Sequence, residues 1–300
     1  MITIGIPSYK RPRMLELALK SLLRTNLIGA LIVVIQAPDI HDYKKYVHVI
    51  KNLSDRYDVE VLAEFHKIRL GSANARNRIL YIASQTFSKR DILVLYDDDF
   101  ICPSKDSLLP VIEWLSQDYI GLVGGKVINL FRRAIDPDVY LNLMPYLAEV
   151  LSTLTGFVFI DTKHGPRYAN YTPNLLALRV KLASLIRYDP NYRGTGYREE
   201  SDLQEQVRRL GYKIIFDPRF YVYHMNVSYG GNRDIDSLPL RFYWKARNNT
   251  YFVIKNEKGT LRLVLSNAII SAYAMLHGIR CLKAVTQGLR DILSMMNIRS

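Results

Sequence analysis

Residues 91–100, DILVLYDDDF, place three consecutive aspartates directly after an apolar run that is typical of a buried strand. Neighbouring carboxylates repel one another, and the fold is destabilised unless a cation or a hydrogen-bond donor offsets their charge. The stretch therefore predicts a buried strand that ends at a site where the carboxylates meet a cation or hydrogen-bond donors.

The sequence on the N-terminal side of this stretch alternates between strand-like and helix-like periodicity. Such alternation is typical of βαβ units and indicates an α/β fold with a mostly parallel or mixed central sheet flanked by helices. The expected strands are 2–6, 30–35, 59–65 and 91–96, and the expected helices are 13–25, 42–55 and 72–87.

The three aspartates fall at the carboxyl end of their strand. In open α/β sheets, ligands bind in the crevice outside the carboxyl ends of the strands. We therefore expect the loops PSYKRP (7–12) and RLGSAN (69–74) to gather beside the aspartates at that edge.

The second half of the chain is less regular. Residues 155–161 (TGFVFID) and 174–180 (NLLALRV) suit strands of a mixed sheet, and residues 213–224 suit one or two short strands. Paired glycines make 227–236 a candidate mobile loop, and the chain is helical in pattern from about Leu238.

A helix is expected over residues 200–212 (ESDLQEQVRRLGY). Its apolar positions Leu203, Val207 and Leu210 should point inward, and Gly211 should end it, because glycine readily adopts the left-handed conformation that follows many helices.

Composition sets broader limits. The chain has 300 residues, of which 49% are hydrophobic, so it has material for a substantial core. Two cysteines far apart, Cys102 and Cys281, favour a reducing compartment, the cytoplasm by default, and the opening residues do not resemble a signal peptide. The formal net charge is +13, and residues 241–300 contribute ten basic and two acidic side chains, or +8.

The basic C-terminal segment has an amphipathic pattern. The uncharged run between Arg262 and Arg280 is too short and too polar for a confident membrane span. On a helix, a polar stripe groups Arg262, Ser266, Tyr273, His277 and Arg280, and the apolar residues of the next stretch are Leu282, Val285, Leu289 and Ile292. We predict peripheral contact of residues 260–300 with an anionic membrane surface; the alternative is that the apolar stripes pack on the catalytic domain or on a second subunit of a homodimer.

Several motifs occur in an order that resembles a known family. They are TIGIPSYKRP near the N-terminus, GSANARN (71–77), the D-x-D of YDDDF, REESDLQEQVRRLGYKIIFDP (198–218), YVYH, and FYWKARNNTYFVIKN (242–256). Together they resemble the family-2-type, nucleotide-sugar-dependent glycosyltransferases of the GT-A fold. The resemblance implies a catalytic domain over 1–237, with a nucleotide-sugar half (1–128) and an acceptor half (129–237), followed by a helical extension over 238–300.

The resemblance implies a divalent cation, Mg²⁺ or Mn²⁺, because a nucleoside diphosphate is a poor leaving group until its charge is neutralised. By this resemblance Asp97 faces the ribose, Asp99 binds the metal, and His224 supplies a further metal contact. The alternatives are a hydrated acidic turn for the aspartates and a hydrogen-bonded structural role for His224.

Inversion at the anomeric carbon needs one group that takes the proton of the acceptor hydroxyl. By resemblance Glu200 stands at the position of this base, and Asp202 lies nearer the acceptor or caps the helix. The helix N-terminus favours the ionised form of Glu199 and Glu200. The alternative is that these carboxylates only complement the helix dipole.

The predicted donor-binding residues are Pro7, Tyr9, Gln36, Arg76, Asp97 and Asp98. Arg76 is expected near the phosphates or, alternatively, in an ion pair on its own helix. Gln36 stands where relatives have an aspartate that contacts uracil, and because an amide both donates and accepts, uracil, guanine and thymine all stay open.

The sequence thus predicts a metal-dependent, inverting glycosyltransferase that moves a sugar from a nucleoside-diphosphate sugar to a hydroxyl of a glycan or lipid-linked acceptor. A sugar nucleotidyltransferase is the first alternative, but its Gly-rich opening is missing from GIPSYKRP. A non-enzymatic polyanion-binding protein is the second. It gives no reason for DDD or REESD, and the basic residues lack the interleaved aromatic side chains of single-strand binders, so no nucleic-acid partner is expected.

Overall fold

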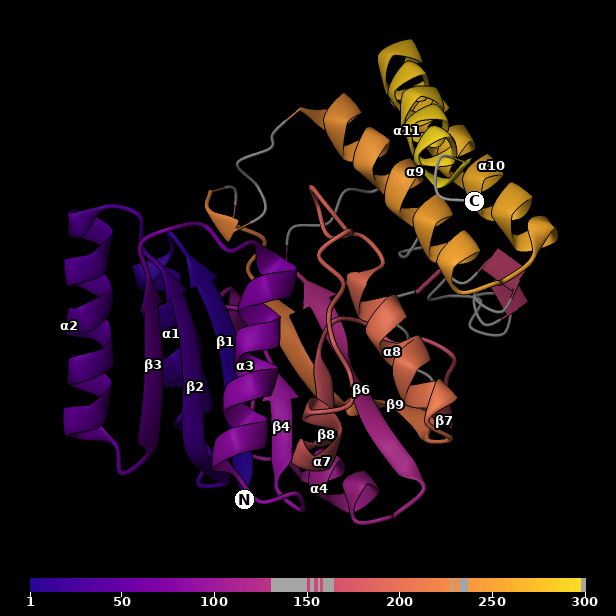
Figure 1. The fold of residues 1–300 in the computed structure, drawn as a ribbon. Helices are drawn as coiled ribbons and strands as arrows, with labels where there is room; N and C mark the ends of the chain where they lie inside the picture. Colours follow the sequence, from indigo (N-terminus) through magenta and orange to yellow (C-terminus); the bar gives the residue numbers. More distant parts are fainter. Residues whose placement is uncertain are drawn as a thin grey trace.

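The computed structural model describes residues 1–130, 150–151, 154–155, 157–158, 165–227, 229–231 and 237–297. Its centre is a mixed nine-stranded sheet in the order β3-β2-β1-β4-β8-β6-β9-β5, with β7 paired to β9 (Figure 1). The strands are β1 (Ile2–Tyr9), β2 (Ile28–Gln36), β3 (Glu60–His66), β4 (Ile92–Leu95), β5 (Phe100–Ile101), β6 (Ile120–Asn129), β7 (Arg167–Tyr168), β8 (Leu176–Arg179) and β9 (Lys213–His224).

The first four strands of the order are parallel, as the alternating pattern predicts. The helices between them are α1 (Pro12–Leu22), α2 (Ile40–Arg56) and α3 (Ser72–Thr86). Each overlaps the helix expected from the sequence. Strand β1 continues to Tyr9, beyond the expected end at Ile6, so Pro7 and Tyr9 belong to the strand and not to the loop that follows it.

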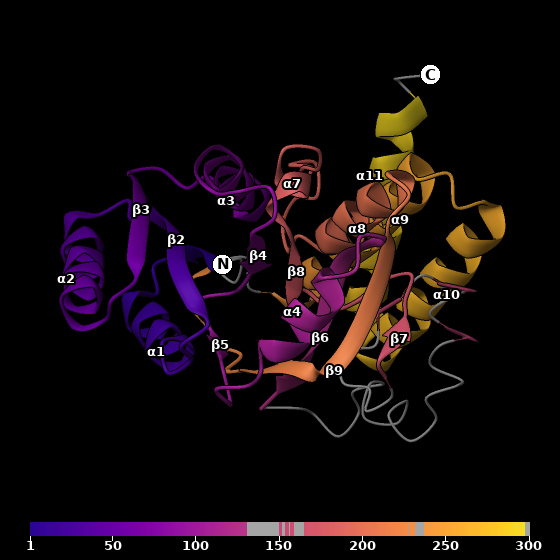
Figure 2. The same ribbon diagram turned by 90° about the horizontal axis from the view of Figure 1, so that it is seen from below.

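Helices cover both faces of the sheet (Figure 2). On one face, α1, α2 and α4 (Leu109–Leu115) pack on alternate strand residues such as Leu31 and Val33. On the other, α3, α7 (Val180–Ala183) and α8 (Glu199–Arg209) pack on the residues between them, such as Ile32 and Val34. Because β2 is buried on both faces, its sequence is apolar up to its last residue, Gln36, instead of alternating.

The second half of the sheet is mixed. Strand β8 runs antiparallel to both β4 and β6, and it confirms the strand expected within 174–180. The strand expected over 155–161 is wrong where the structure describes it, because Thr155 is helical and residues 157–158 are not in a strand; the rest lies outside the described residues. Most of the expected loop 227–236 also lies outside them, as do residues 131–149 of the predicted acceptor half.

Helix α8 confirms the helix expected around 200–212. Leu203 and Val207 are fully buried, but Leu210 is 44% exposed, so its expected inward position is wrong. The helix ends at Arg209, one residue earlier, and the chain turns at Gly211 with a φ of +88°. Leu210 therefore no longer follows the helical face that Leu203 and Val207 share.

Three helices follow: α9 (Leu238–Lys255), α10 (Thr260–Leu276) and α11 (Ile279–Asn297). They form a layer beyond α8, with α10 at its outer edge (Figures 1 and 2). The amide of Asn249 on α9 donates to Ser266 Oγ, and Ser266 is fully buried. Val285 and Ile292 of α11 are buried as well.

The expected orientation of this tail is therefore wrong. Part of the polar stripe of α10 points inward because Ser266 finds a hydrogen-bond partner there, and the apolar stripe of α11 packs within the layer. The apolar side chains left exposed on and beside α10 are Leu261, Val264, Ile269, Met275, Leu276 and Ile279. No helix in the described part of the chain is long and apolar enough to cross a bilayer.

Candidate active site

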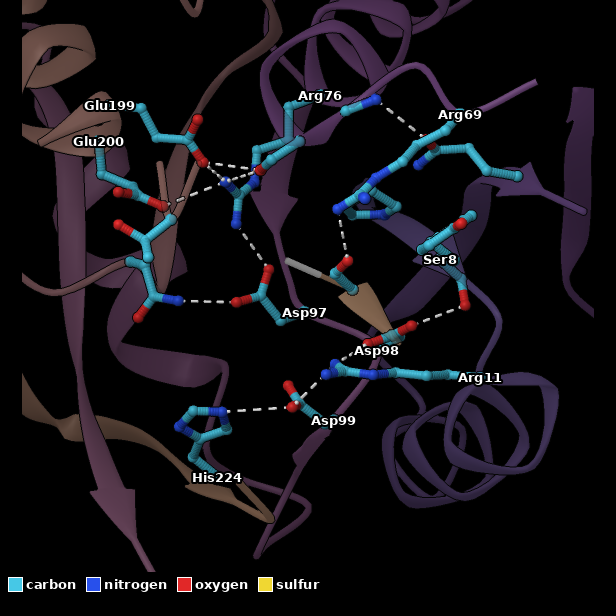
Figure 3. Close-up of a pocket in the computed structure, with 18 residues that line it drawn as sticks. Ser8, Arg11, Arg69, Arg76, Asp97, Asp98, Asp99, Glu199, Glu200 and His224 are labelled. Atoms are coloured by element: carbon cyan, nitrogen blue, oxygen red, sulfur yellow. Dashed lines mark hydrogen bonds and ion pairs between the residues drawn. The ribbon is translucent and has the colours of Figure 1, made fainter. Parts of the chain in front are cut away.

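A pocket of about 250 Å³ lies where β1, β2 and β4 end. The expected loops meet there, since residues from 7–12 and from 69–74 line the pocket together with the three aspartates (Figure 3). The lining residues are Pro7, Ser8, Tyr9, Arg11, Gln36, Arg69, Gly71, Ser72, Arg76, Asp97, Asp98, Asp99, Asn174, Thr195, Glu199, Glu200, His224 and Gly231.

Two of the aspartates share one arginine. Nη1 of Arg11 donates to Asp98 Oδ1 and to Asp99 Oδ2, both at 3.0 Å, and Ser8 Oγ donates to Asp98 Oδ2 at 2.7 Å. The same guanidinium donates to the backbone oxygens of Tyr229 and Gly230. Burial raises the pKa of Asp98 to about 7, although Arg11 acts in the opposite direction. The guanidinium of Arg11 thus offsets part of the negative charge of Asp98 and Asp99.

His224 faces Asp99. Its Nδ1 lies 2.7 Å from Asn129 Oδ1, which can only accept, so Nδ1 donates to Asn129 and Nε2 is the ring nitrogen that faces Asp99. Nε2 lies 3.3 Å from Asp99 Oδ2. The Asp99 carboxylate oxygen and, in a neutral ring, His224 Nε2 could both coordinate one cation at this point.

This donor set fits a divalent cation that also binds substrate. No group of three or more His, Cys, Asp or Glu side chains arranged for a metal occurs among the described residues. Mg²⁺ characteristically uses one or two carboxylates together with substrate phosphates, so the carboxylate of Asp99 meets this requirement and His224 would add a nitrogen ligand. The structure brings both predicted metal residues to one point of the pocket.

A second arginine organises the other acidic residues. Arg76 on α3 is buried, and Nη2 donates to Asp97 Oδ1 at 2.7 Å. Nη1 donates to Glu199 Oε1 and lies 3.1 Å from Glu200 Oε1. Of the two predicted roles of Arg76, the ion pair describes these contacts, although its carboxylate partners belong to the turn after β4 and to α8 rather than to its own helix.

One guanidinium does not neutralise three carboxyl groups. Burial raises the pKa of Glu199 to about 8, and Arg76 lowers it less than burial raises it. Burial also raises the pKa of Glu200. The loss of hydration thus acts against the ionised form of both residues, which the position at the helix N-terminus favours.

The two glutamates differ in access. Glu199 is 2% exposed, with Oε1 held by Ser72 and Arg76. The Glu200 side chain is 21% exposed and lines the pocket. Of the pair, Glu200 is the one that a ligand can reach more easily.

Asp202 does not line the pocket. Its side chain is 1% exposed and accepts from Tyr192, Lys255 and Asn256. These partners place it against α9 and the chain before α8 rather than at the cavity. The structure therefore assigns Asp202 to the junction with the C-terminal helices, against the predicted place near an acceptor.

Tyr9 and Gln36 are neighbours at the ends of β1 and β2. The guanidinium of Arg69 lies 4.9 Å from the centre of the Tyr9 ring. Pro7, Tyr9, Gln36, Asp97 and Asp98 all line the pocket, so the predicted donor residues come together in space.

Sequence reasoning missed Arg11, Arg69 and Asn174. Asn174 donates to Asp97 Oδ2 at 2.7 Å and so fixes the carboxyl that Arg76 also holds. The signal for Arg11 was present, since three adjacent carboxylates require a counter-charge and PSYKRP was expected beside them. Nothing in the sequence pattern around Asn174 singles it out.

No protein-family model matches the sequence, and no curated protein matches it either. The structure, however, is similar to solved glycosyltransferases. A mannosyltransferase from Pyrobaculum calidifontis in complex with GDP-Man and Mn²⁺ has a TM-score of 0.60 at 15% identity, covering 98% of this chain and 75% of that one. TarS residues 1–349 from S. aureus has a TM-score of 0.54 at 12% identity, covering 90% and 69%.

GalNAc-T7 with UDP, GalNAc and Mn²⁺ has a TM-score of 0.52 at 16% identity, covering 84% of this chain and 47% of that one. At these identities the likeness establishes the fold. The chain has the GT-A glycosyltransferase fold, as the sequence predicts.

Proposed function

We propose that the chain is a metal-dependent, inverting glycosyltransferase of the family-2 type, which transfers a sugar from a nucleoside-diphosphate sugar to an acceptor hydroxyl. The observation that carries the proposal is the convergence of Asp97, Asp99, Glu200 and His224 on one pocket at the carboxyl edge of a GT-A sheet. They come from three distant segments of the sequence, and their meeting at one pocket supports a shared site.

The roles follow from access and hydrogen bonding. Asp97, fixed by Arg76 and Asn174, presents a carboxyl edge for donor hydroxyls. Asp99 and His224 would hold the divalent cation, which when bound neutralises the charge of the departing diphosphate. Glu200 is the general base, and its raised pKa makes it a stronger proton acceptor than an ordinary glutamate.

Arg76 positions Glu200 rather than contacting phosphate. Its donors are directed to Asp97, Glu199 and Glu200, so these carboxyl groups occupy the guanidinium although Arg76 also lines the pocket. Five carboxyl groups around the pocket also argue against a polyanion-binding protein, because an anionic ligand needs a cation to approach them.

A thermal-shift panel of nucleotide sugars, with and without Mn²⁺ or Mg²⁺, tests the proposal, since any ligand of the native state raises its stability. We expect stabilisation by at least one nucleotide sugar that depends on the metal. Asp99→Asn should abolish the metal-dependent part of the shift and lower transfer roughly 10³-fold or more, because the cation supplies several kcal/mol of charge stabilisation.

Asp106→Asn, at an exposed position outside the pocket, is the matched control and should behave as wild type. If Asp99→Asn keeps the full metal-dependent shift, the metal site lies elsewhere.

We further propose that the C-terminal layer rests on an anionic membrane surface, and that the acceptor is lipid-linked. The contact face differs from the one that the sequence predicted. Leu276 is 79% exposed and Met275 61%, on a helix that is followed by Arg280 and Lys283. An exposed apolar helix face beside basic residues suits the boundary of an anionic leaflet.

Flotation with liposomes tests this second proposal on the full chain. Replacing Val264, Met275 and Leu276 by serine should abolish binding to vesicles that contain anionic lipid, and high salt should weaken binding of the wild type. The control variant replaces three exposed apolar residues on other elements by serine; they are Ile40, Leu109 and Leu185. Equal binding by both variants, or none by the wild type, would discard the membrane contact.

A further inference from the structure

Gln36 is the last residue of β2 and lies beside Tyr9 in the sheet. It is 3% exposed and lines the pocket. Its Oε1 accepts from two backbone groups of the β3–α3 loop, Leu70 N at 2.7 Å and Gly71 N at 3.1 Å. The side chain is therefore held by the loop on one side and borders the cavity on the other.

These two bonds fix which way the amide points. Both donors are backbone N–H groups, so the atom that accepts them is the oxygen, and Nε2 is directed away from the loop. Among the described residues, none accepts a hydrogen bond from Nε2. Rotating the amide would leave the backbone N–H groups of Leu70 and Gly71 without this acceptor, which is unfavourable. Gln36 thus offers the pocket two N–H donors and no acceptor.

The residues around Gln36 have the same character. Arg69 lies over the Tyr9 ring and also lines the pocket, and a guanidinium donates but does not accept. The acidic group of Glu199 and Glu200 with Arg76 lies at the other end of the pocket from Arg69 (Figure 3). An aromatic ring beside two donor side chains suits a nucleobase that presents acceptors.

We propose that Gln36 selects the base of the donor nucleotide, and that this base is guanine, bound through its adjacent acceptors O6 and N7. The proposal rests on the proposed function and deepens it, since the donor becomes a guanosine-diphosphate sugar. Uracil and thymine present no two adjacent acceptors to a pair of donors, because the N3–H group separates their two carbonyl oxygens. Adenine presents an amino donor beside N7. Guanine pairs well with side chains that offer two donors.

The first test is the affinity of the wild-type chain for GDP, UDP, CDP and ADP by titration calorimetry with Mn²⁺ present. We expect GDP to bind roughly 10-fold or more tightly than UDP, because one mismatched hydrogen bond is worth about a factor of ten. Tighter binding of UDP, or equal affinity for all four, overturns the base assignment while leaving the glycosyltransferase proposal intact. Tighter binding of CDP, whose base has adjacent acceptors at O2 and N3, overturns guanine as the base.

The second test is Gln36→Glu. A carboxylate keeps one oxygen for the N–H groups of Leu70 and Gly71 and replaces the pocket-facing NH₂ by a second acceptor. Affinity for GDP should fall roughly 10-fold and affinity for UDP should rise, so that the preference reverses. Gln85→Glu, exposed near the far end of α3, controls for the added charge and should keep the wild-type order.

An unchanged order in Gln36→Glu would show that Gln36 does not read the base. Absence of binding by every diphosphate to the wild type would instead contradict the proposed function itself.

Discussion

Two clusters of charged residues meet helix α8 and differ in balance. At the N-terminus of the helix, Glu199 and Glu200 join Asp97–Asp99 around the pocket, and five carboxyl groups pair with Arg11 and Arg76. Five acids against two arginines leave an excess of three negative charges if all are ionised. We call this set the pocket cluster.

One turn later, the carboxyl groups have matching cations. Lys255 bridges Asp189 and Asp202, Lys258 lies 2.5 Å from Glu205, and Arg208 lies 3.0 Å from the same carboxyl group. We call these three acidic and three basic residues the junction cluster, because they join α8 and the chain before it to α9 and to the residues just after α9.

The carboxyl pKa values of the two clusters differ in the same way as their balance of acidic and basic residues. In the pocket cluster, burial raises the pKa of Glu199 and Glu200. In the junction cluster, burial opposes ionisation too, but hydrogen bonds from Lys255 lower the pKa of Asp189, and those from Lys258 lower the pKa of Glu205. An acidic cluster without enough cations is arranged for a ligand or a reaction, whereas a balanced one holds elements together.

The largest expected effect is a loss of activity when a residue of the pocket cluster is changed. Glu200→Gln keeps the size of the side chain but cannot take a proton, so transfer should fall roughly 10²- to 10⁴-fold with little change in donor affinity. The measurement is release of nucleoside diphosphate from the donor, with water or an added saccharide as acceptor. Wild-type turnover in this variant would move the base to another residue, and Glu199→Gln is then the next variant to measure.

The next largest effect is a loss of stability when a residue of the junction cluster is changed. Asp202→Ala removes one partner of a buried pair and leaves Lys255 with Asp189 alone, which should cost about 3 kcal/mol in the free energy of unfolding. Urea unfolding gives this value, and turnover per folded molecule should stay near wild type. Asp106→Ala, at an exposed position away from both clusters, controls for loss of an aspartate side chain. A large loss of turnover without loss of stability would place Asp202 in the reaction after all.

The smallest effect concerns pH. Glu199 binds its proton more tightly in the folded chain, with a pKa of about 8, than in the unfolded chain. Its contribution to stability is therefore complete below the ordinary glutamate pKa and is lost as pH rises toward 8. Glu199→Gln should remove this loss, so between pH 5 and pH 8 the variant loses less stability than wild type, by on the order of 1 kcal/mol or more.

In the junction cluster, stability changes with pH in the opposite direction. The lowered pKa values of Asp189 and Glu205 give stability that is present above the ordinary carboxyl pKa and is lost as pH falls below it. Unfolding of Glu199→Gln measured below pH 4 should therefore follow the wild-type curve. A variant that differs from wild type only in this acid range would contradict the assignment.

Much of the site could be predicted from local sequence. An apolar run followed by DDD fixes both the strand and the position of its carboxylates at the carboxyl edge, because parallel strands bring those ends together. The loops before α1 and α3 were placed by the same rule. The predicted membrane face of α10 was wrong, because helical periodicity reports which residues share a face but not which face finds partners. Ser266 points inward only because Asn249 lies opposite.

The sequence by itself determined the layered α/β architecture, the helices of the C-terminal segment and the acidic character of the site, since these depend on periodicity and on residue type within short stretches. Only the tertiary structure decided which cation meets which carboxylate, that Asp202 serves the junction with α9, and that Gln36 turns its N–H groups to the pocket. The physical reason is that hydrogen bonds and ion pairs depend on atoms within a few ångströms, and their partners here, such as Arg11 with Asp99 or Gln36 with Gly71, are tens of residues apart in sequence.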